Sequence, residues 1–233
     1  MNGYKEVTAN ENFGFLDNYD RPLIQEYIPG KIHDVATVSD RGKVKGALTQ
    51  VREITYPIYG GTGSVNVTTY EPELLDLGRR MLESVGWHGP AQVEFKLDPR
   101  DSSYKLMEVN PKFWGTLDLS IKAGIDFAEM ACQIALSEDV KPQFNYKVGL
   151  TYRWLMTGEL RSMAQDPHKS KAILEFVRRF FRRNTAYDSM FTDLVPDVVR
   201  LLDSVAFIAK GHIQPAGENL DPLSLSSARP DCK

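Results

Sequence analysis

The sequence has little cysteine and no long apolar run. Cys132 and Cys232 are the only cysteines among 233 residues, which is too few for a disulfide framework, and no Cys-x-x-Cys pair or Cys/His cluster suggests zinc. No window of about 18 apolar residues is present, as a membrane-spanning helix requires, and the first residues lack a signal-peptide core. The formal net charge of −3 gives no general basic field for nucleic acid. We therefore expect a cytoplasmic protein with reduced thiols and neither a nucleic-acid nor a membrane partner.

The first third of the chain alternates as β-strands do. Runs at residues 23–28, 32–39 and 44–55 end at turn-forming Pro-Gly or Asp-Arg-Gly sequences or at a glycine-rich stretch, and short runs with tight turns favour an antiparallel sheet. The glycine-rich stretch 59–64 is expected to be a loop.

The period then changes to that of a helix. Residues 72–85 carry apolar side chains at helical spacing, with Pro72 near the first turn and Gly86 beyond the end. Two strands are expected around 90–97 and 104–110, two helices near 116–123 and 126–137, and one further strand within 146–155.

The chain is expected to divide into three parts. Residues 1–156 form an α+β domain, an antiparallel sheet with flanking helices; residues 157–210 form a helical extension packed on it; and residues 211–233, rich in Pro, Ser, Asp and Asn, form an unfolded tail.

The hairpin at 91–110 carries the most informative chemistry. The apolar residues of the two strands stand at odd-numbered positions: Val93, Phe95, Leu97, Met107 and Val109. If they all share the core face, a loop centred near residue 101 fixes the register of the two strands. That register pairs Gln92 with Asn110, Glu94 with Glu108, and Lys96 with Leu106.

Glu94 and Glu108 would then stand side by side on one face. Two facing carboxylates are destabilising unless a positive charge lies between them or one is protonated. With the nearby amide oxygen of Asn110 they form a set of hard donors that suits Mg²⁺ or Mn²⁺ bound together with phosphate groups. The competing interpretation is a solvated surface pair that Lys96 neutralises. The segment 110–115, Asn-Pro-Lys-Phe-Trp-Gly, favours a site, because loops at strand ends commonly carry function.

These residues resemble a known family. The stretch from Gly89 through AQVEFK…YKLMEVNPKFWGTLDLSIKAGIDF, together with LIQEYIPG at 23–30, is similar to the C-terminal subdomain of the ATP-grasp superfamily. The closer likeness is to carbamoyl-phosphate-synthase-like predicted ATP-dependent carboligases, over roughly residues 1–160.

The resemblance implies a role for each matching position. Glu94, Glu108 and Asn110 match magnesium ligands that bridge ATP phosphates. Glu26 and Ile28 match hinge positions whose backbone receives the adenine edge, and His33 is either a ribose contact or an ordinary surface histidine. Lys112 stands where many members carry a phosphate-binding Arg, and Arg52 and the loop 60–64 are expected to face the acceptor substrate.

The resemblance also implies an activity and a missing part. The intact protein would be a Mg-ATP-dependent ligase that joins a carboxylate to an amine through an acyl phosphate, a reaction that needs no side-chain nucleophile. The N-terminal half that supplies lysines and a glycine-rich lid is not in this sequence. The alternative is a non-catalytic nucleotide-binding or assembly module; a homodimer is a further expectation.

The segment 169–183 is basic and amphipathic. Such a face is usually solvated, and we expect that here; contact with an anionic membrane or with a phosphate-bearing partner is the less favoured alternative.

Overall fold

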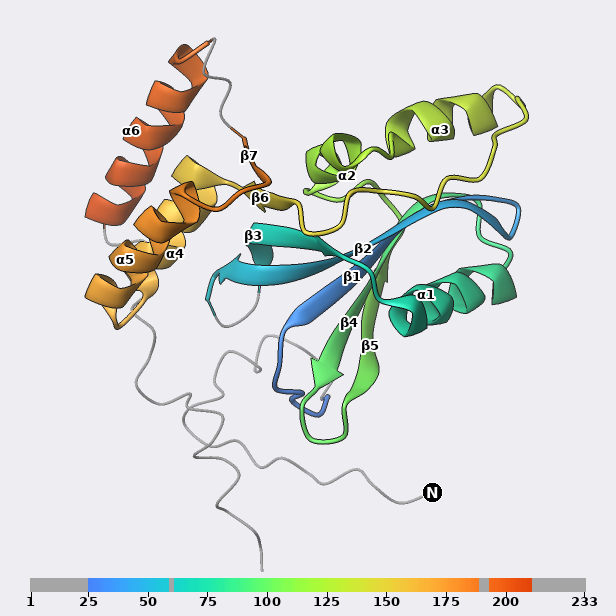
Figure 1. The fold of residues 1–233 in the computed structure, drawn as a ribbon, viewed down its shortest axis with the longest axis horizontal. Coiled ribbons are helices and arrows are strands. Elements are labelled where there is room, and N and C mark those ends of the chain that lie inside the picture. Colours follow the sequence, from blue (N-terminus) through green and yellow to red (C-terminus); the bar gives the residue numbers. More distant parts are fainter. Residues whose placement is uncertain (1–24, 59–60, 189–192, 211–233) are drawn as a thin grey trace, which may run out of the picture.

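The computed structural model describes residues 25–58, 61–188 and 193–210. Its centre is a seven-stranded sheet in the order β5-β4-β1-β2-β3-β6-β7, in which every neighbouring pair is antiparallel except β6 and β7 (Figure 1). The strands are β1 (Ile32–Asp40), β2 (Lys43–Tyr56), β3 (Thr62–Thr69), β4 (Gly89–Asp98), β5 (Ser103–Asn110), β6 (Thr151–Arg153) and β7 (Thr185–Tyr187). The expected α+β class with an antiparallel sheet is confirmed.

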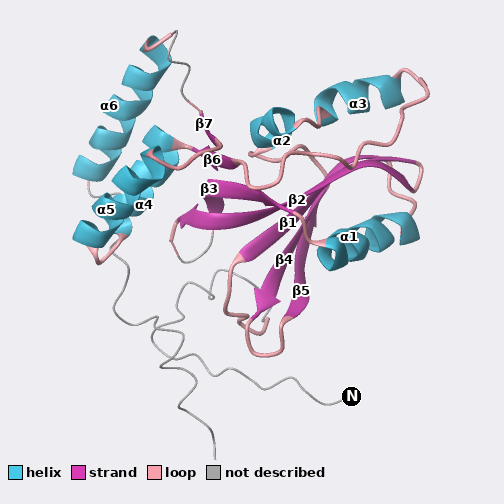
Figure 2. Cartoon of the chain, viewed as in Figure 1, coloured by secondary structure: helices cyan, strands magenta, loops and turns pink. Residues whose placement is uncertain are grey.

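Helices lie against the sheet and at one end of it (Figure 2). They are α1 (Pro72–Ser84), α2 (Leu117–Ala123), α3 (Phe127–Ala135), the π-helix η2 (Leu155–Glu159), α4 (Leu160–Gln165), α5 (Lys169–Phe180) and α6 (Val195–Ala209). Among the described residues, no helix has both the length and the apolar character needed to cross a membrane.

The two faces of the sheet bury separate apolar clusters. On one face Val35, Val93 and Phe95 pack against α1. On the other, Ala36 and Leu48 pack against residues of α2 and α3. Since successive strand residues point to opposite faces, the parity of a residue number in β1 tells which cluster its side chain joins.

The turn between β1 and β2 shows how local chemistry sets the register. Arg41 and Gly42 both have positive φ, +46° and +81°, and connect the paired residues Asp40 and Lys43. Two such residues form the tight turn that matches the twist of a two-stranded hairpin, as the Asp-Arg-Gly sequence indicates.

The β4–β5 hairpin has the predicted register only at its far end. Gln92 pairs with Asn110 and Glu94 with Glu108, as predicted. The third predicted pair, Lys96 with Leu106, is wrong: Lys96 faces Lys105. The turn is one residue shorter than expected, because Asp98 pairs with Ser103. A register shift between Glu94 and Phe95 restores the predicted pairing.

This β-bulge changes which side chains of β5 reach the core. Met107, expected on the core face, is 40% exposed, whereas Tyr104 and Val109 pack against the cluster that contains Phe95. The prediction failed for Met107 because it assumed strict alternation along the whole strand.

Other segments also depart from expectation. Residues 25–28, the described part of the first expected strand, have no regular structure. Strand β3 begins at Thr62, inside the expected glycine-rich loop, because it completes its hydrogen bonds with β2. Strand β7 was not expected. The expected tail at 211–233 lies outside the described residues.

A buried ionic network joins the helices at the end of the sheet to β6. Arg153 is fully buried and donates from Nε to Glu159 Oε2 at 2.8 Å, and Arg179 of α5 donates to the other oxygen of Glu159 at 3.1 Å. The guanidinium of Arg153 also stands over the rings of Phe176 and Phe180. Removing one partner of such a pair leaves an uncompensated buried charge, so loss of any of the three side chains would disturb the packing of α5 on the sheet.

Candidate functional site

Polar side chains form a row across four strands on one face of the sheet. Asp34 on β1 pairs with Gln50 on β2 and with Glu94 on β4, and Glu94 pairs in turn with Glu108 on β5. Paired residues of neighbouring strands point to the same face. The row therefore lies on the face covered by α2 and α3. We call Asp34, Gln50, Arg52, Glu94, Glu108 and Asn110 the polar row.

Arg52 holds the two buried acids of the polar row. Its Nη2 lies 2.9 Å from Asp34 Oδ1 and 2.5 Å from Glu94 Oε1, and its Nε donates to Asp34 Oδ2 at 3.2 Å. Asp34 is fully buried and Glu94 is 6% exposed. Arg52 thus supplies the positive charge that neighbouring carboxylates need, the part that Lys96 plays in the competing interpretation from sequence.

The carboxylates of the polar row still outnumber its cation. Burial raises the pKa of Asp34, although Arg52 and a hydrogen bond from Gln50 act in the opposite direction. Burial also raises the pKa of Glu94; Arg52 lowers it, whereas the charges of Asp34 and Glu108 raise it further. A second cation beside Glu94 and Glu108 would therefore be stabilised by the charges already present.

Asn110 lies between the two glutamates. Its Nδ2 donates to Glu94 Oε1 at 3.1 Å and to Glu108 Oε1 at 2.8 Å, so one amide group reaches both carboxylates. Rotation of that amide by half a turn would present its oxygen to the same position. Within the described ranges no group of three His, Cys, Asp or Glu side chains is placed to hold a metal. The donor set of two carboxylates and an amide fits Mg²⁺, which usually completes its shell with water and phosphate oxygens.

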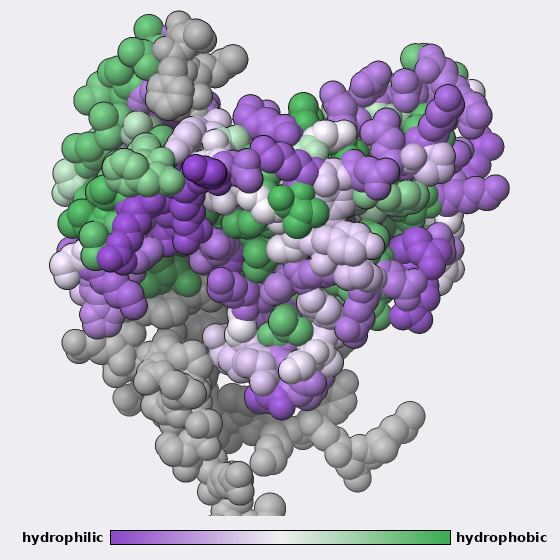
Figure 3. Space-filling view, viewed as in Figure 1, coloured by the Kyte–Doolittle hydropathy of each residue, from purple (hydrophilic) through white to green (hydrophobic). Residues whose placement is uncertain are grey.

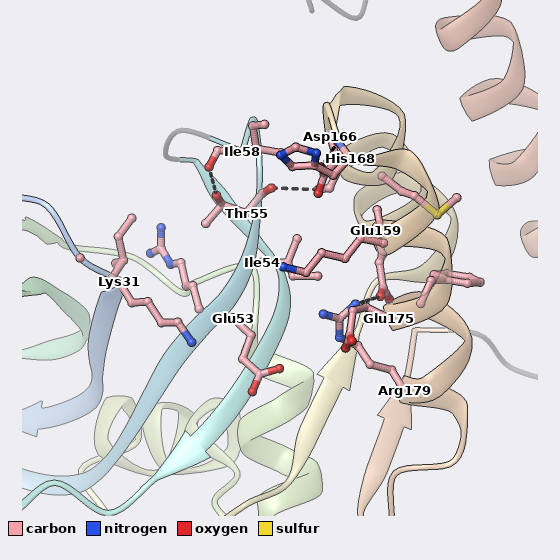
Figure 4. Close-up of a pocket in the computed structure, with 18 of the residues that line it drawn as sticks. Lys31, Glu53, Ile54, Thr55, Ile58, Glu159, Asp166, His168, Glu175 and Arg179 are labelled. Carbon is pink, nitrogen blue, oxygen red and sulfur yellow. Dashed lines mark hydrogen bonds and ion pairs between the residues drawn. The ribbon is translucent and has the colours of Figure 1, made fainter. Parts of the chain in front are cut away.

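A cavity of about 500 Å³ opens beside Arg52 (Figure 4). Lys31, Glu53, Ile54 and Thr55 line its sheet side. The opposite wall is formed by residues of η2, α4, α5 and the link between α4 and α5; those labelled in the figure are Glu159, Asp166, His168, Glu175 and Arg179. A cavity of this size accommodates a small organic ligand.

Residues 25–30, expected to be the hinge, run along the edge of this cavity. Tyr27 and Gly30 line it. Lys96 Nζ donates to the carbonyl oxygen of Ile28 at 2.8 Å and stands over the Tyr27 ring. Lys96 therefore anchors this segment and is not in contact with Glu94. Glu26 is exposed and pairs with Arg100 at 2.8 Å.

His33 lies on the opposite face of the sheet from Glu94. Its Nδ1 is 3.0 Å from Glu71 Oε2, and the Tyr104 hydroxyl donates to the same carboxylate. Burial alone would raise the pKa of Glu71, but hydrogen bonds from His33, Thr69 and Tyr104 lower it to about 2. The structure thus separates His33 from the polar row and places it in hydrogen-bond contact with Glu71, next to α1.

Lys112 follows the polar row directly and is exposed. Its backbone N–H donates to the carbonyl oxygen of Asn110 at 2.9 Å, which forms a tight turn just after β5. The side chain is thereby attached to the end of the strand that carries Glu108 and Asn110.

Sequence reasoning missed Asp34, Gln50 and Thr116. The Gln50 amide donates to Asp34 at 3.0 Å and to Thr116 Oγ1 at 2.8 Å, and so connects the polar row to the start of α2. One available signal was a carboxylate inside the expected strand 32–39, since a carboxylate is seldom buried without a partner.

The chain matches a family model and is similar to several solved structures. A family model described as ATP-grasp in the biosynthetic pathway with Ter operon matches residues 19–157. A biotin carboxylase–beta-gamma-ATP complex from Campylobacter jejuni is 16% identical, with a TM-score of 0.45 over 55% of this chain and 30% of that one.

Two further solved structures are similar at the same level. Pyruvate carboxylase T882A from Rhizobium etli is 13% identical with a TM-score of 0.43, over 54% of this chain and 14% of that one. The biotin carboxylase domain of 2-oxoglutarate carboxylase from Hydrogenobacter thermophilus, in complex with MgADP, ADP and bicarbonate, is 14% identical with a TM-score of 0.41, over 54% and 29%. The chain spans less than a third of the length of these structures.

Proposed function

Because the chain belongs to the family of ATP-grasp proteins in the biosynthetic pathway with the Ter operon, we propose that its polar row binds the phosphates of ATP through Mg²⁺. The proposal extends to a reaction, the ATP-dependent joining of a carboxylate to an amine through an acyl phosphate.

The observation that carries the proposal is the shared amide between two facing carboxylates. Glu94 and Glu108 both lie within hydrogen-bond distance of Asn110 Nδ2, and one of them is buried in a cluster with an excess of negative charge. When bound, Mg²⁺ would supply charge neutralisation for the transferred phosphoryl group. Glu94, Glu108 and the Asn110 oxygen are the residues that would hold it.

The nucleoside would occupy the cavity beside the polar row. Tyr27 and Lys96 line it from the hinge side, so a nucleoside there would lie next to the backbone of residues 26–28. Arg52 lines the same cavity and contacts Glu94. Glu94 and Glu108 do not line the cavity themselves, so the phosphates of a nucleotide bound there would pass Arg52 and lie over β1 to reach them.

Arg52 and Lys112 would serve the phosphates in different ways. Arg52 is held by Asp34 and Glu94, so its charge is fixed in position before any ligand arrives, which is the condition for electrostatic stabilisation of a transition state. Lys112 is an exposed point charge on a turn, suited to following a phosphate as it is transferred.

Calorimetric titration of the full chain with ATP, with and without Mg²⁺, tests the proposal. Glu108 is exposed, so Glu108→Gln removes one ligand charge without disturbing the buried cluster. We expect Mg-dependent binding that this variant weakens by tenfold or more, since hydrogen bonds and charges at such a site contribute about 1.5–3 kcal/mol each. The matched control is Glu138→Gln, an exposed acid after α3. Equal affinity of wild type and Glu108→Gln would refute the assignment.

Turnover distinguishes the ligase from the alternative, a non-catalytic module. Release of ADP and phosphate in the presence of an acid and an amine supports the ligase. Tight Mg-ATP binding without turnover of any acid–amine pair supports a module that binds nucleotide only.

A further inference from the structure

Two helices of the C-terminal region direct apolar side chains away from the protein. On α6 the buried residues include Asp197 and Ser204, whereas Val195 is 71% and Leu202 63% exposed. In the space-filling view, apolar residues gather over α6, and the strongly hydrophilic residues of the neighbouring helices lie beside them (Figure 3). A helix on a soluble surface usually has the opposite arrangement.

The same inversion occurs on α5. Its Arg179 faces inward to Glu159, and the backbone carbonyl of Phe176 accepts from Arg153. The residues spaced along its outer side are apolar and 46–82% exposed: Ile173, Leu174, Val177 and Phe181. No residue of α5 is buried. The described part of the chain therefore leaves roughly half or more of each of these four apolar side chains exposed, and we call the four residues the apolar stripe of α5.

Cations flank the apolar stripe of α5. Residues 168–183 contain six Lys and Arg side chains and one carboxylate, although the whole chain has a net charge of −3. Arg179 faces inward to Glu159 and Lys171 lines the cavity, which leaves Lys169, Arg178, Arg182 and Arg183 outside the cavity. Glu175 and Glu53 pair with Arg178 and Arg182 at the surface, where such pairs are weak and exchange readily. Arg183 makes no ion pair with a described residue.

We propose that α5 binds an anionic lipid surface, with the apolar stripe in the interface and the flanking arginines on the phosphate groups. A helix with Phe and Leu on one side and Lys and Arg beside them lies in the plane of such an interface, and long cationic side chains reach its phosphates while their stems stay apolar. The sequence alone favours a solvated face for residues 169–183; the exposure of the apolar side is what reverses that interpretation.

Charge favours lipid over a second copy of the chain. A two-fold contact would place the same patch against itself and bring the cations of one α5 against those of the other. An anionic bilayer offers opposite charge over the whole length of the helix. Residues of α5 line one wall of the cavity, but Phe181 and Arg183 do not, so variants at these two positions test lipid binding separately from nucleotide binding.

The test is co-sedimentation of the full chain with lipid vesicles. We expect binding to phosphatidylcholine vesicles that contain about a third phosphatidylserine, little binding to pure phosphatidylcholine, and loss of binding at high salt. Phe181→Asp and Arg183→Glu should each reduce the partition coefficient roughly tenfold or more. Matched controls are Leu136→Asp, a similarly exposed apolar residue just after α3, and Lys141→Glu; both should bind as wild type does.

Three outcomes would overturn the proposal. One is equal binding of wild type and Phe181→Asp. Another is a wild-type dimer in light scattering that Phe181→Asp converts to monomer, which would assign the stripe to a second copy. The third is no vesicle binding together with a lower melting temperature of Phe181→Asp than of Leu136→Asp, which would show that the chain itself covers the stripe.

Discussion

Arg52 is the residue on which the polar row depends. It contacts both Asp34 and Glu94, and removing one partner of a buried pair costs more than the pair contributes, because the remaining charge has no compensation. We expect Arg52→Met to lower the free energy of unfolding by about 3–5 kcal/mol at neutral pH, measured by urea denaturation.

The exposed pair of Arg80 and Asp76 provides the control for that variant. Arg80→Met removes the same group from the surface of α1 and should leave the denaturation midpoint almost unchanged. A similar loss of stability in both variants would mean that the replacement of Arg by Met is itself costly, and that the buried acids beside Arg52 are not the cause.

Removing the charge of Glu94 should not destabilise the protein as removing that of Arg52 does. The pKa of Glu94 is raised in the folded state, so ionising Glu94 lowers the free energy of unfolding. This loss of stability is absent at pH values below the ordinary pKa of 4.5 and complete at pH values above the raised pKa. Glu94→Gln escapes this cost and keeps an oxygen for Arg52. Without Mg²⁺ we expect it to be neutral or slightly stabilising at pH 7, within about 1 kcal/mol.

Urea denaturation over a range of pH checks this sign. The two proteins should have converging stabilities as the pH falls below 4.5, where Glu94 is protonated in both the folded and unfolded states. A clear loss of stability in Glu94→Gln at pH 7 would show that the attraction between Glu94 and Arg52 outweighs burial and the repulsion from Asp34 and Glu108.

At the scale of elements, the β4–β5 hairpin shows how far pattern reasoning extends. Apolar alternation predicts the facing of Glu94 and Glu108 correctly, whereas the expected loop midpoint leads to the same pair only because the bulge offsets a turn that is one residue shorter than expected. Neither predicts the bulge, because a one-residue irregularity depends on which side chains fit the core, here Tyr104 instead of Met107. The sequence also predicts no strand at 62–69, where β3 lies. Gly63 is unfavourable in an isolated strand, and pairing with β2 outweighs that preference.

The bulge leads to a deletion test. Removing Met107 would join the pair Phe95–Leu106 directly to the pair Glu94–Glu108, so both halves of the hairpin keep their partners. We expect the deletion to preserve the fold with a change in unfolding free energy of less than about 2 kcal/mol. Deleting Val109, which pairs within the regular part opposite Val93, moves Asn110 to the core face and should cost considerably more. Circular dichroism with urea denaturation compares the two; equal losses would contradict the role of Met107 as the extra residue.

At the scale of the whole molecule, the order of strands was beyond reach of the sequence. Strand β1 lies between β2, its neighbour in the chain, and β4, which follows about 60 residues later. Only that pairing brings Asp34 beside Glu94, and only that pairing shows that His33 points to the other face. Local motifs thus predict the Glu94–Glu108 pair, whereas Asp34 and Gln50 join the site through long-range topology.

Ligand binding should be visible in the stability of the whole chain. At a concentration of Mg-ATP one hundred times its Kd, binding to the folded state adds about 2.7 kcal/mol, which corresponds to a rise in melting temperature of roughly 5–10 °C for a chain of this size. If Lys112 follows the terminal phosphate, Lys112→Ala should reduce the rise produced by Mg-ATP and leave that produced by Mg-ADP unchanged. Lys141→Ala, an exposed lysine beyond α3, should reduce neither. If Lys112→Ala reduces the rise in melting temperature equally with both nucleotides, this lysine contacts the inner phosphates instead. If EDTA leaves the rise produced by ATP unchanged, nucleotide binding does not require a metal.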